Sequence, residues 1–427
     1  MPTKGISLVA LACTVGALLS TDARAAGFLF YEVGTPEVGL ASAGVAARAS
    51  SPSTLLSNPA GMTQLDGSQV QVASVLAYGH LQFSPDAQTD PFLGTNDGGN
   101  VVGLLPSGGA FATFAPWRDV RLGVGLFTNF GAPQSWDPTW LGRYYTTQST
   151  LIGISLMPAV AWHIADGLSV GAAINTMYGH LKQVVAVQNV ELQAPDGSLQ
   201  VSSSTLGIGA NLGVLYALSS STRFGVTYTS PVKLNFSSKP GFSGLGPGLS
   251  AVLAATGLDT ATLDLGMKVP QTFTLGFFHA LGDRWAIMGD AGWQNWAAFG
   301  AVEVGITTSV PRGITTAIAF TDTWHLGLGA QVQLSPAWLL NFGAAYASSM
   351  PDDQSRSLSL SLASQLRLGV GAQVAIDPHW NLGFASELLW GGSPAVDVDR
   401  GPLAGHVSGS YASTWILFLS FGFTWKA

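Results

Sequence analysis

The sequence predicts an all-β protein, a fourteen-stranded antiparallel transmembrane β-barrel with a small N-terminal hatch that plugs its lumen. Only 10% of the residues are charged, against about 25% in ordinary soluble domains. After the first 25 residues, however, no uninterrupted apolar run reaches the ~18 residues that a transmembrane helix needs. Apolar residues instead alternate with small or polar ones, and short connections alternate with long ones. A closed barrel explains these observations, because its strands need only alternate apolar residues to face lipid.

The alternation is clearest at residues 152 to 164. The apolar face of that segment is Ile152, Ile154, Leu156, Pro158, Val160, Trp162 and Ile164. The intervening residues are small or mixed, as expected for a semi-polar interior. The pattern returns near 168–174, 338–346, 380–390 and 415–425. Aromatic residues recur at the ends of these segments, which is typical of the interfacial girdles of membrane barrels.

The connections between these segments follow an alternating order. Tight turns are expected at 117–119, 165–167, 219–221, 282–284, 335–337 and 377–379, and long loops at 81–106, 131–148, 181–203, 237–267, 298–320, 349–362 and 392–411. Six turns and seven loops separate fourteen strands within residues 67–427. Since outer-membrane barrels have short periplasmic turns and extended outer loops, loops 131–148 and 237–267 should lie outside the cell.

The first residues predict a cleavable signal peptide over residues 1–25. A cationic start precedes an apolar stretch from Ile6 to Leu19, and Ala23-Arg24-Ala25 forms a small-x-small cleavage site. The mature chain is expected to begin at Ala26. An alternative is a lipoprotein signal ending at Cys13, which would leave an unusually short apolar core. If Cys13 is discarded, the mature chain has no cysteine for a disulfide framework, a thiolate metal site or a nucleophile.

The charge of the chain argues against a nucleic-acid partner. Removing residues 1–25 lowers Lys+Arg from 17 to 15 and Asp+Glu from 24 to 23, which gives a net charge of −8. An acidic chain without a basic run is a poor partner for DNA or RNA.

Residues 26–66 do not follow the barrel pattern. They contain scattered glycines, an alanine-rich stretch from Ala41 to Ala49 and the sequence Asn58-Pro59-Ala60-Gly61. The segment is too apolar for a solvated tail and predicts short helical turns and loops. Its length suits a hatch folded inside the barrel.

The residues resemble the FadL family of outer-membrane transporters along almost the whole mature chain. The resemblance lies in the segments Ala26–Phe28, Gly39–Ala46, Asn58–Ala60, Asn129–Gly131, Trp140–Tyr144, Gly225–Tyr228 with Ser230–Val232, Val269–Thr272, Trp285–Trp296, Asp322–Trp324 and Met350–Asp353, in family order. It implies a bacterial outer-membrane barrel that takes up hydrophobic small molecules, either fatty acids or hydrocarbons. It also implies a monomer with outer-membrane lipid, lipopolysaccharide and the barrel-assembly machinery as partners, and no cofactor.

The resemblance further implies roles for named residues. Asn58, Pro59 and Ala60 belong to the hatch and are expected to act in gating, with Asn58-Pro59 as a pivot because proline fixes φ. In the family, the third strand kinks inward and opens the barrel wall sideways. In this chain Gly123 and Gly125, with Phe127, are the candidates for that kink.

Glycine also repeats at alternate positions in Gly327-Leu328-Gly329 and Gly369-Val370-Gly371. The favoured structural interpretation of all three pairs is close approach of the inward-facing backbone to a plug, or strand bending.

The loop at 237–267 is a candidate surface for ligand capture. Leu245, Leu249, Val252 and Leu253 recur there at roughly helical spacing. Exposed apolar helices at a barrel mouth mark binding surfaces for oily ligands, although packing against a neighbouring loop would give the same pattern. A carboxylate ligand would gain from a cation near an apolar pocket, and Arg143 and Lys268 are candidate anchors by position only.

The chain departs from the family pattern at Gln365-Leu366-Arg367-Leu368, where the family has a basic and aromatic strand start, and at Trp425-Lys426-Ala427, where a terminal aromatic is usual. The first departure bears on ligand range. The second departure bears on how strongly the barrel-assembly machinery recognises the C-terminus.

Two other function classes remain as alternatives. A general diffusion porin would line its channel with charged side chains, whereas the expected lumen face carries small residues with Phe127, Met177 and Phe418. A lipid hydrolase would need a Ser-His constellation. Gly167-Leu168-Ser169-Val170-Gly171 matches the nucleophile-elbow expression, but it starts an alternating strand instead of a strand-to-helix turn. No catalytic or metal-binding residue is therefore assigned.

Overall fold

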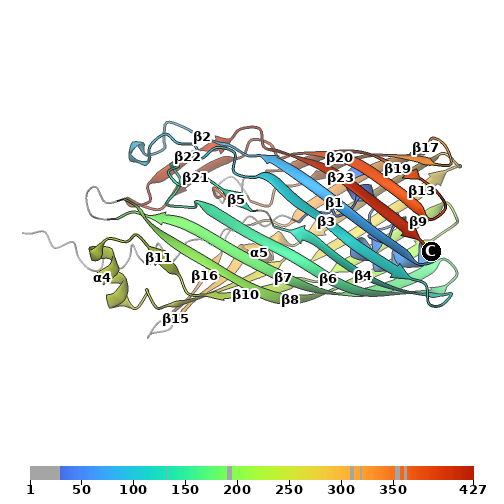
Figure 1. Cartoon of the computed structure of the whole chain (residues 1–427), viewed down its shortest axis with the longest axis horizontal. Coiled ribbons are helices and arrows are strands. Elements are labelled where there is room, and N and C mark those ends of the chain that lie inside the picture. The colour runs from blue at the N-terminus through green and yellow to red at the C-terminus, as the bar shows by residue number, and fades with distance from the viewer. Residues whose placement is uncertain are drawn as a thin grey trace, which may run out of the picture.

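The computed structural model describes residues 29–131, 133–189, 195–307, 312–317, 320–351, 356–359 and 363–427, with backbone alone at 300–307 and 312–317. Fourteen antiparallel strands close into a barrel (Figure 1). These strands are β1 (Gln69–His80), β3 (Gly103–Phe114), β4 (Val120–Phe130), β6 (Gln148–Ala165), β7 (Leu168–Val187), β8 (Gly197–Ala217), β9 (Thr222–Thr229), β13 (Thr272–Leu281), β14 (Trp285–Gln294), β17 (Thr323–Gln333), β18 (Trp338–Ala347), β19 (Gln365–Ala375), β20 (Trp380–Trp390) and β23 (Trp415–Lys426). The predicted signal peptide lies outside the described residues.

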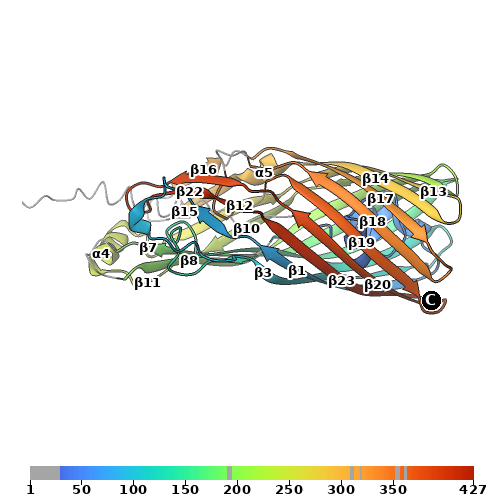
Figure 2. The same ribbon diagram turned by 90° about the horizontal axis from the view of Figure 1, so that it is seen from above.

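The first and last strands complete the ring. β1 pairs with β23 from Gln69↔Lys426 to His80↔Trp415, and each remaining strand pairs with its chain neighbours in the ring. The expected number of strands and the order of short turns and long loops are both confirmed. The C-terminus lies at the end that carries the short turns, and the long loops lie at the opposite end (Figures 1 and 2).

The barrel wall has an apolar outer face and a smaller-residue inner face. In β6 the predicted apolar face, from Ile154 to Ile164, is exposed, while Ser155 and Met157 are buried inside. Aromatic residues form two exposed girdles. The short-turn girdle includes Trp162, Tyr216, Trp285, Trp338, Trp380 and Trp425, and the long-loop girdle includes Tyr78, Tyr178, Tyr228, Trp324, Tyr346 and Trp390.

The spacing of the girdles fits a bilayer. Trp380 and Trp390 begin and end β20, ten residues apart. At about 3.4 Å per residue this is about 34 Å along the strand. A tilt of about 35 to 45° reduces the span to about 24 to 28 Å, close to the ~25 Å apolar band of outer-membrane barrels.

The long-loop end is an ordered extension of the barrel. The expected loop at 181–203 is shorter than predicted, because Val184 to Val187 pair with Gly197 to Gln200 and carry the β7–β8 hairpin outward. A second sheet has the order β10 (Val232–Ser238), β12 (Thr262–Val269), β15 (Ala301–Thr307) and β16 (Arg312–Ala317). A third sheet joins β2 (Phe83–Pro85), β22 (His406–Tyr411) and β21 (Ala395–Asp399). The remaining outer elements are β5 (Gln134–Ser135), β11 (Gly241–Ser243), η2 (Pro91–Leu93), α4 (Pro247–Thr256) and α5 (Trp296–Gly300).

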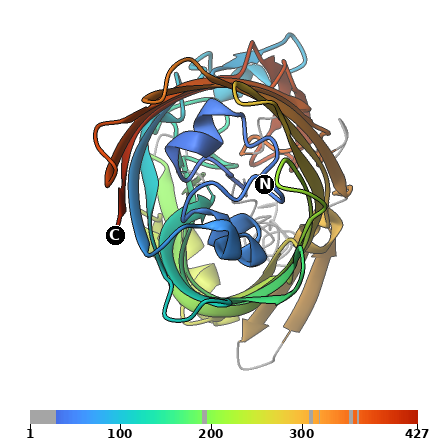
Figure 3. The same cartoon turned by 90° about the vertical axis from the view of Figure 1, so that its right-hand side faces the viewer.

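Residues 29–66 fold inside the ring, at the short-turn end (Figure 3). They form the short helices α2 (Thr35–Gly39), α3 (Thr54–Ser57) and η1 (Pro59–Gln64), joined by turns. Most of these residues are buried. No helix in the described ranges is both long and apolar enough to cross a bilayer.

Candidate functional site

Inward-facing glycines let the hatch lie directly against the barrel wall. A Cβ at Gly343 would overlap the backbone of Leu40, and one at Gly225 would overlap the carbonyl oxygen of Ala46. The predicted glycine pairs Gly327/Gly329 and Gly369/Gly371 likewise face hatch residues between Val38 and Ala43. Close approach to a plug is therefore the structural role of these glycines.

Asn58 connects three parts of the molecule. Its Nδ2 donates to the carbonyl oxygens of Ala46 in the hatch, at 2.6 Å, and of Val214 in the wall, at 3.1 Å. Its Oδ1 accepts from the backbone N–H of Ala60, at 3.1 Å, and so caps η1, which begins at Pro59. The side chain is fully buried with every polar atom paired. Asn58 thus ties the hatch loop, η1 and β8 together.

Gly123 and Gly125 lie in the third barrel strand, β4, with their missing side chains toward the hatch. A Cβ at Gly123 would lie 2.6 Å from the sulfur of Met62, and one at Gly125 would lie 3.1 Å from Cδ1 of Leu55. Both glycines pair regularly with β3 and with β6. The expected kink is therefore not centred on this pair, which instead accommodates the hatch.

The irregularity of β4 lies further along the strand. Its register against β6 shifts between Thr128 and Phe130. Its pairing with β3 ends at Gly108↔Thr128, although β3 continues to Gly103 along β1. The edge of β3 from Gly103 to Ser107 is thus left without a backbone ladder to β4. On the inner side, the N–H of Phe30 bonds to the carbonyl oxygen of Asn129, at 2.9 Å.

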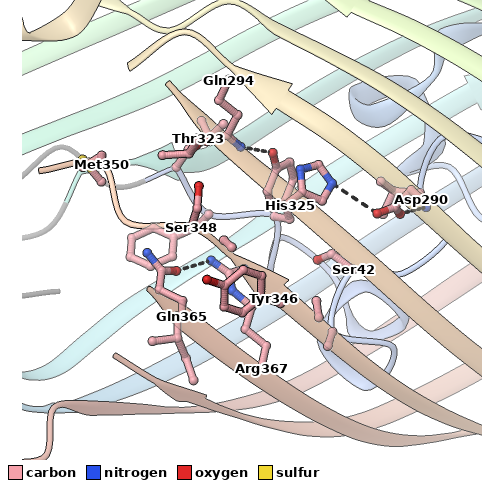
Figure 4. Close-up of a pocket in the computed structure, with 18 of the residues that line it drawn as sticks. Ser42, Asp290, Gln294, Thr323, His325, Tyr346, Ser348, Met350, Gln365 and Arg367 are labelled. Atoms are coloured by element: carbon pink, nitrogen blue, oxygen red, sulfur yellow. Dashed lines mark hydrogen bonds and ion pairs between the residues drawn. The ribbon is translucent and has the colours of Figure 1, made fainter. Parts of the chain in front are cut away.

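Two cavities occupy the lumen above the hatch. The first has about 720 Å³ of empty space and is shown in Figure 4. Its apolar lining includes Leu29, Phe30, Trp296, Met350 and Leu389. Its polar lining includes Gln294, His325, Gln365 and Arg367. Apolar walls with a few convergent polar groups are typical of pockets for small apolar ligands with a polar group.

The second cavity has about 850 Å³ of empty space and lies on the other side of the segment Leu29 to Tyr31, which lines both cavities. It extends to Asn129, at the irregular part of β4. Met157, Met177 and Val232 supply apolar surface, while asparagines and threonines on β7, β8, β9 and β13 supply uncharged polar groups. Residues 29 to 31 therefore line both a cavity below the outer loops and a cavity that reaches the wall at Asn129 of β4.

One buried ion pair joins the hatch to the wall at the first cavity, and a third buried charged group lies near it. Arg367 of β19 pairs with Glu32 of the hatch and donates to Oε1 of Gln365, at 3.0 Å. Glu387 of β20 is fully buried nearby, and neither carboxylate oxygen has a hydrogen-bond partner in the part of the chain that the structure describes. Sequence reasoning noted Arg367 only as a departure from a family pattern. A charged residue at an inward-facing position of a strand whose other inward-facing residues are mostly small could have pointed to this site.

The two cations predicted as carboxylate anchors are elsewhere. Arg143 lies in the outer loops and pairs with Asp196, with Nε and Oδ2 at 2.8 Å, while its guanidinium stacks on Tyr144. Burial opposes the charged form of Arg143, but the bonds to Asp196 and Tyr144 outweigh it and raise the pKa of Arg143. Lys268 lies in β12, on the strand face opposite the buried Met267 and Val269. Neither residue lines the two lumen cavities.

The predicted capture residues lie on and beside α4. Leu249 and Leu253 are buried, and Leu245 and Val252 are half-buried against the same outer core. That core includes Val185, Val187 and Leu199 of the β7–β8 hairpin. Packing between loops therefore accounts for Leu249 and Leu253, while a role in capture stays a prediction for the whole segment.

The structure brings one serine and one histidine together. The hydroxyl of Ser169 lies 3.2 Å from Nδ1 of His163 and accepts from the hydroxyl of Thr63, at 2.8 Å. Ser169 is buried beneath the hatch, so this geometry anchors Thr63 and offers no path for a lipid substrate. Within the described ranges, no group of three or more His, Cys, Asp or Glu side chains is placed to hold a metal ion.

Comparisons with known proteins agree with this architecture. Residues 16–424 match the family model described as outer membrane protein transport protein (OMPP1/FadL/TodX). The chain is 25% identical over 377 residues to a long-chain fatty acid transport protein of Salmonella typhi, covering 82% of this chain and 84% of that protein. It is 24% identical over 375 residues to outer membrane protein P1 of Haemophilus influenzae, covering 79% and 80%.

Solved structures share the fold. A Pseudomonas aeruginosa FadL homologue superposes with a TM-score of 0.82 at 19% identity, covering 94% of this chain and all of that one. The Pseudomonas putida toluene transporter TodX superposes with a TM-score of 0.68 at 16% identity, covering 92% and 98%. Because the family model spans nearly the whole chain, this protein belongs to the OMPP1/FadL/TodX family of outer membrane transport proteins.

Proposed function

We propose that this chain imports long-chain fatty acids or similar hydrophobic molecules by capture at the outer loops, transfer to the lumen cavities and lateral release into the membrane. The observation that carries the proposal is the sequence of spaces along the lumen. The segment Leu29 to Tyr31 lines both cavities, and the second cavity reaches Asn129 of β4, where the register against β6 shifts and beside the residue at which pairing with β3 ends. The curated relatives named for fatty acid transport support the choice of ligand.

The energetics favour a sideways exit. An apolar solute gains nothing by leaving a pocket for water, whereas burial in lipid is worth about 0.8 kcal/mol per methylene group. The periplasmic direction is also filled by the hatch, which is packed against wall glycines. A long acyl chain therefore has a large driving force toward the bilayer and little toward the periplasm.

A porin function has less support. Both cavities are lined mainly by apolar or uncharged residues, and their charged side chains have partners: Arg367 pairs with Glu32, Glu37 with Arg48, and Asp290 bonds to His325 and to the N–H of Val45. A water-filled diffusion channel would expose charged side chains to solvent. Two measurements separate the two functions. A transporter of hydrophobic molecules should take up labelled oleate with little steady ion conductance, whereas a porin should conduct ions steadily.

The experiment measures oleate uptake by cells that express Gly123→Leu, Gly125→Leu or the control Val124→Leu at equal surface levels. The glycine variants push Met62, Leu55 and Phe111 toward the second cavity, so uptake should fall severalfold. Val124 faces lipid on the same strand, and its variant should transport normally. Equal uptake by all three variants would contradict the lateral route through this cavity.

A further inference from the structure

The lysines of the chain are gathered on neighbouring strands of the outer extension. After the predicted signal peptide the sequence has five lysines, and four of them are Lys182, Lys233, Lys239 and Lys268. Lys182 lies on β7, Lys233 on β10 and Lys268 on β12. These strands lie together, because β10 pairs with β12 and packs against β7 and β8 (Figure 1). The fifth lysine, Lys426, ends β23 at the opposite end of the barrel.

Lys233 and Lys268 stand opposite one another on the outer face of the β10–β12 sheet. They are Cα partners in the register of the two strands. The residues on either side of the two lysines are buried: Val232, Leu234, Met267 and Val269. A Cβ at Gly179, an inward-facing position of β7, would lie 3.0 Å from Cδ1 of Leu234. The buried face of the sheet therefore points to the interior, and both lysines point away from it.

The ammonium groups of this surface are not neutralised within the described structure. None of the ion pairs between described side chains includes Lys182, Lys233 or Lys268. Asp264, on the same face of β12, is four residues from Lys268, about 14 Å along the strand. Like charges directly opposite one another destabilise a β-sheet. An anion bound between Lys233 and Lys268 would remove that cost.

The three lysines lie just outside the long-loop aromatic girdle. Lys233 follows the girdle residue Tyr228 by five residues, and Lys182 follows Tyr178 by four. With a rise of about 3.4 Å per residue and a tilt of about 35 to 45°, they lie about 10 to 14 Å outward of the girdle. Aromatic girdles mark the level of the lipid headgroups, and long lysine side chains reach back toward that level. The outer leaflet of an outer membrane presents the phosphate groups of lipopolysaccharide there.

We propose that Lys182, Lys233 and Lys268 form a binding site for the phosphate groups of lipopolysaccharide. Each ammonium group is a compact charge with three donors, which suits a phosphate. One phosphate between Lys233 and Lys268 balances the two opposed charges, and Lys182 on the nearby strand meets a second. None of these lysines lines a lumen cavity, so the site does not depend on transport.

The test measures binding of bis-phosphorylated lipid A to the folded full-length mature protein in detergent micelles, by native mass spectrometry. Wild-type protein should bind this lipid at least about tenfold more tightly than the same lipid without phosphates. Lys233→Gln with Lys268→Gln should weaken binding of the phosphorylated lipid by about tenfold to thirtyfold, the factor for two lysines at an anionic lipid surface. The affinity for the lipid without phosphates should stay within about twofold. Rising salt should weaken only the phosphorylated lipid.

Two further variants distinguish lipid recognition from a structural role. Lys426→Gln is the matched control, because it removes a lysine at the short-turn end. It should leave the affinity for phosphorylated lipid A unchanged. Lys233→Arg with Lys268→Arg keeps both charges and should retain the binding that the glutamine variant loses. Heat-modifiable migration on gels checks that each variant is a folded barrel.

The outcomes decide the proposal. Equal affinity of wild-type protein for lipid A with and without phosphates, full affinity in the glutamine double variant, or an equal loss in Lys426→Gln would overturn the site. Phosphatidylglycerol, which carries a single phosphate, should bind more weakly than lipid A. Equal binding of the two would overturn the assignment to lipopolysaccharide in favour of any anionic lipid. If the glutamine variant does not fold, the comparisons of lipids on wild-type protein still decide.

Discussion

At the scale of single residues, the hatch depends on polar contacts that fix it to the wall. Asn58 is the most connected, since its amide bonds to two hatch segments and to β8. The sequence identified Asn58 through a short motif and its position before the first strand. The partners Ala46 and Val214 could not be predicted, because they are backbone carbonyls that only the fold brings close.

Asn58→Ala should loosen the hatch without unfolding the barrel. Three hydrogen bonds of about 1 kcal/mol each are lost, so docking of the hatch should weaken by about 2 to 4 kcal/mol. Hydrogen exchange of residues 45 to 61 should accelerate while the strands stay protected. Asn58→Asp, which keeps the acceptor for Ala60 but places a buried carboxylate oxygen against the carbonyl oxygens of Ala46 and Val214, should loosen the hatch at least as much as Asn58→Ala. Unchanged exchange in Asn58→Ala would rule out this anchoring role.

His406 gives the outer hairpin β21–β22 a pH dependence. Its bond to Asp397, with Nε2 and Oδ1 2.5 Å apart, raises the pKa of His406 above 6.5. The contribution to stability is therefore fully present below the unfolded pKa and is lost as pH rises through the higher folded pKa. An NMR titration should show a His406 midpoint above 6.5 that falls in Asp397→Asn. A midpoint that Asp397→Asn does not move would contradict the assignment.

At the scale of elements, the sequence predicted the barrel strands better than the outer extension. Alternation within β6 or β23 reports a strand in contact with lipid on one side and lumen on the other. The β10–β12 pair and α4 have no lipid on either side, so their apolar residues pack in an outer core instead. Long Gly- and Pro-containing segments thus looked like loops although they contain strands and a helix.

The alternation of turns and loops sets the topology. Cysteines at Ser135 and Ser250, both exposed at the long-loop end, should react with an impermeant reagent on intact cells. A cysteine at Ser335, in a short turn, should react only after the outer membrane is opened. The predicted mature chain has no cysteine of its own, which keeps the background low. If the cysteine at position 335 alone were labelled on intact cells, the barrel would have the opposite orientation in the membrane.

The hatch should act as a plug. The intact protein should give little or no steady conductance in a planar bilayer, because residues 29–66 fill the ring at the short-turn end. Deletion of residues 26–66 should raise the conductance if the barrel closes without them. Matched recordings of Asn58→Ala should show intermediate, intermittent openings. Large ohmic steps from the intact protein would favour the porin function instead.

At the scale of the whole molecule, the low charge content and the missing apolar runs were enough to predict a membrane barrel, and the composition and length of residues 26–66 predicted its hatch. The contact between Glu32 and Arg367 was out of reach, because these residues are far apart in sequence and meet only when the hatch docks. The expected kink was placed at Gly123 and Gly125 because glycine permits bending. The register shift occurs at Asn129, which the sequence marked only through the resemblance of Asn129–Gly131 to the family and not as a bend.

The central claim is that an apolar ligand leaves sideways between β3 and β4. Photocross-linking with a diazirine analogue of palmitate, followed by mass spectrometric mapping of the labelled residues, tests it most directly. Labels should appear on the inward-facing Leu105 and Ser107 of β3 and on Asn129 of β4, beside the unpaired edge. Labels on Thr63, Ser169 and Arg223 at the periplasmic end of the lumen, with none at the β3 edge, would contradict lateral release.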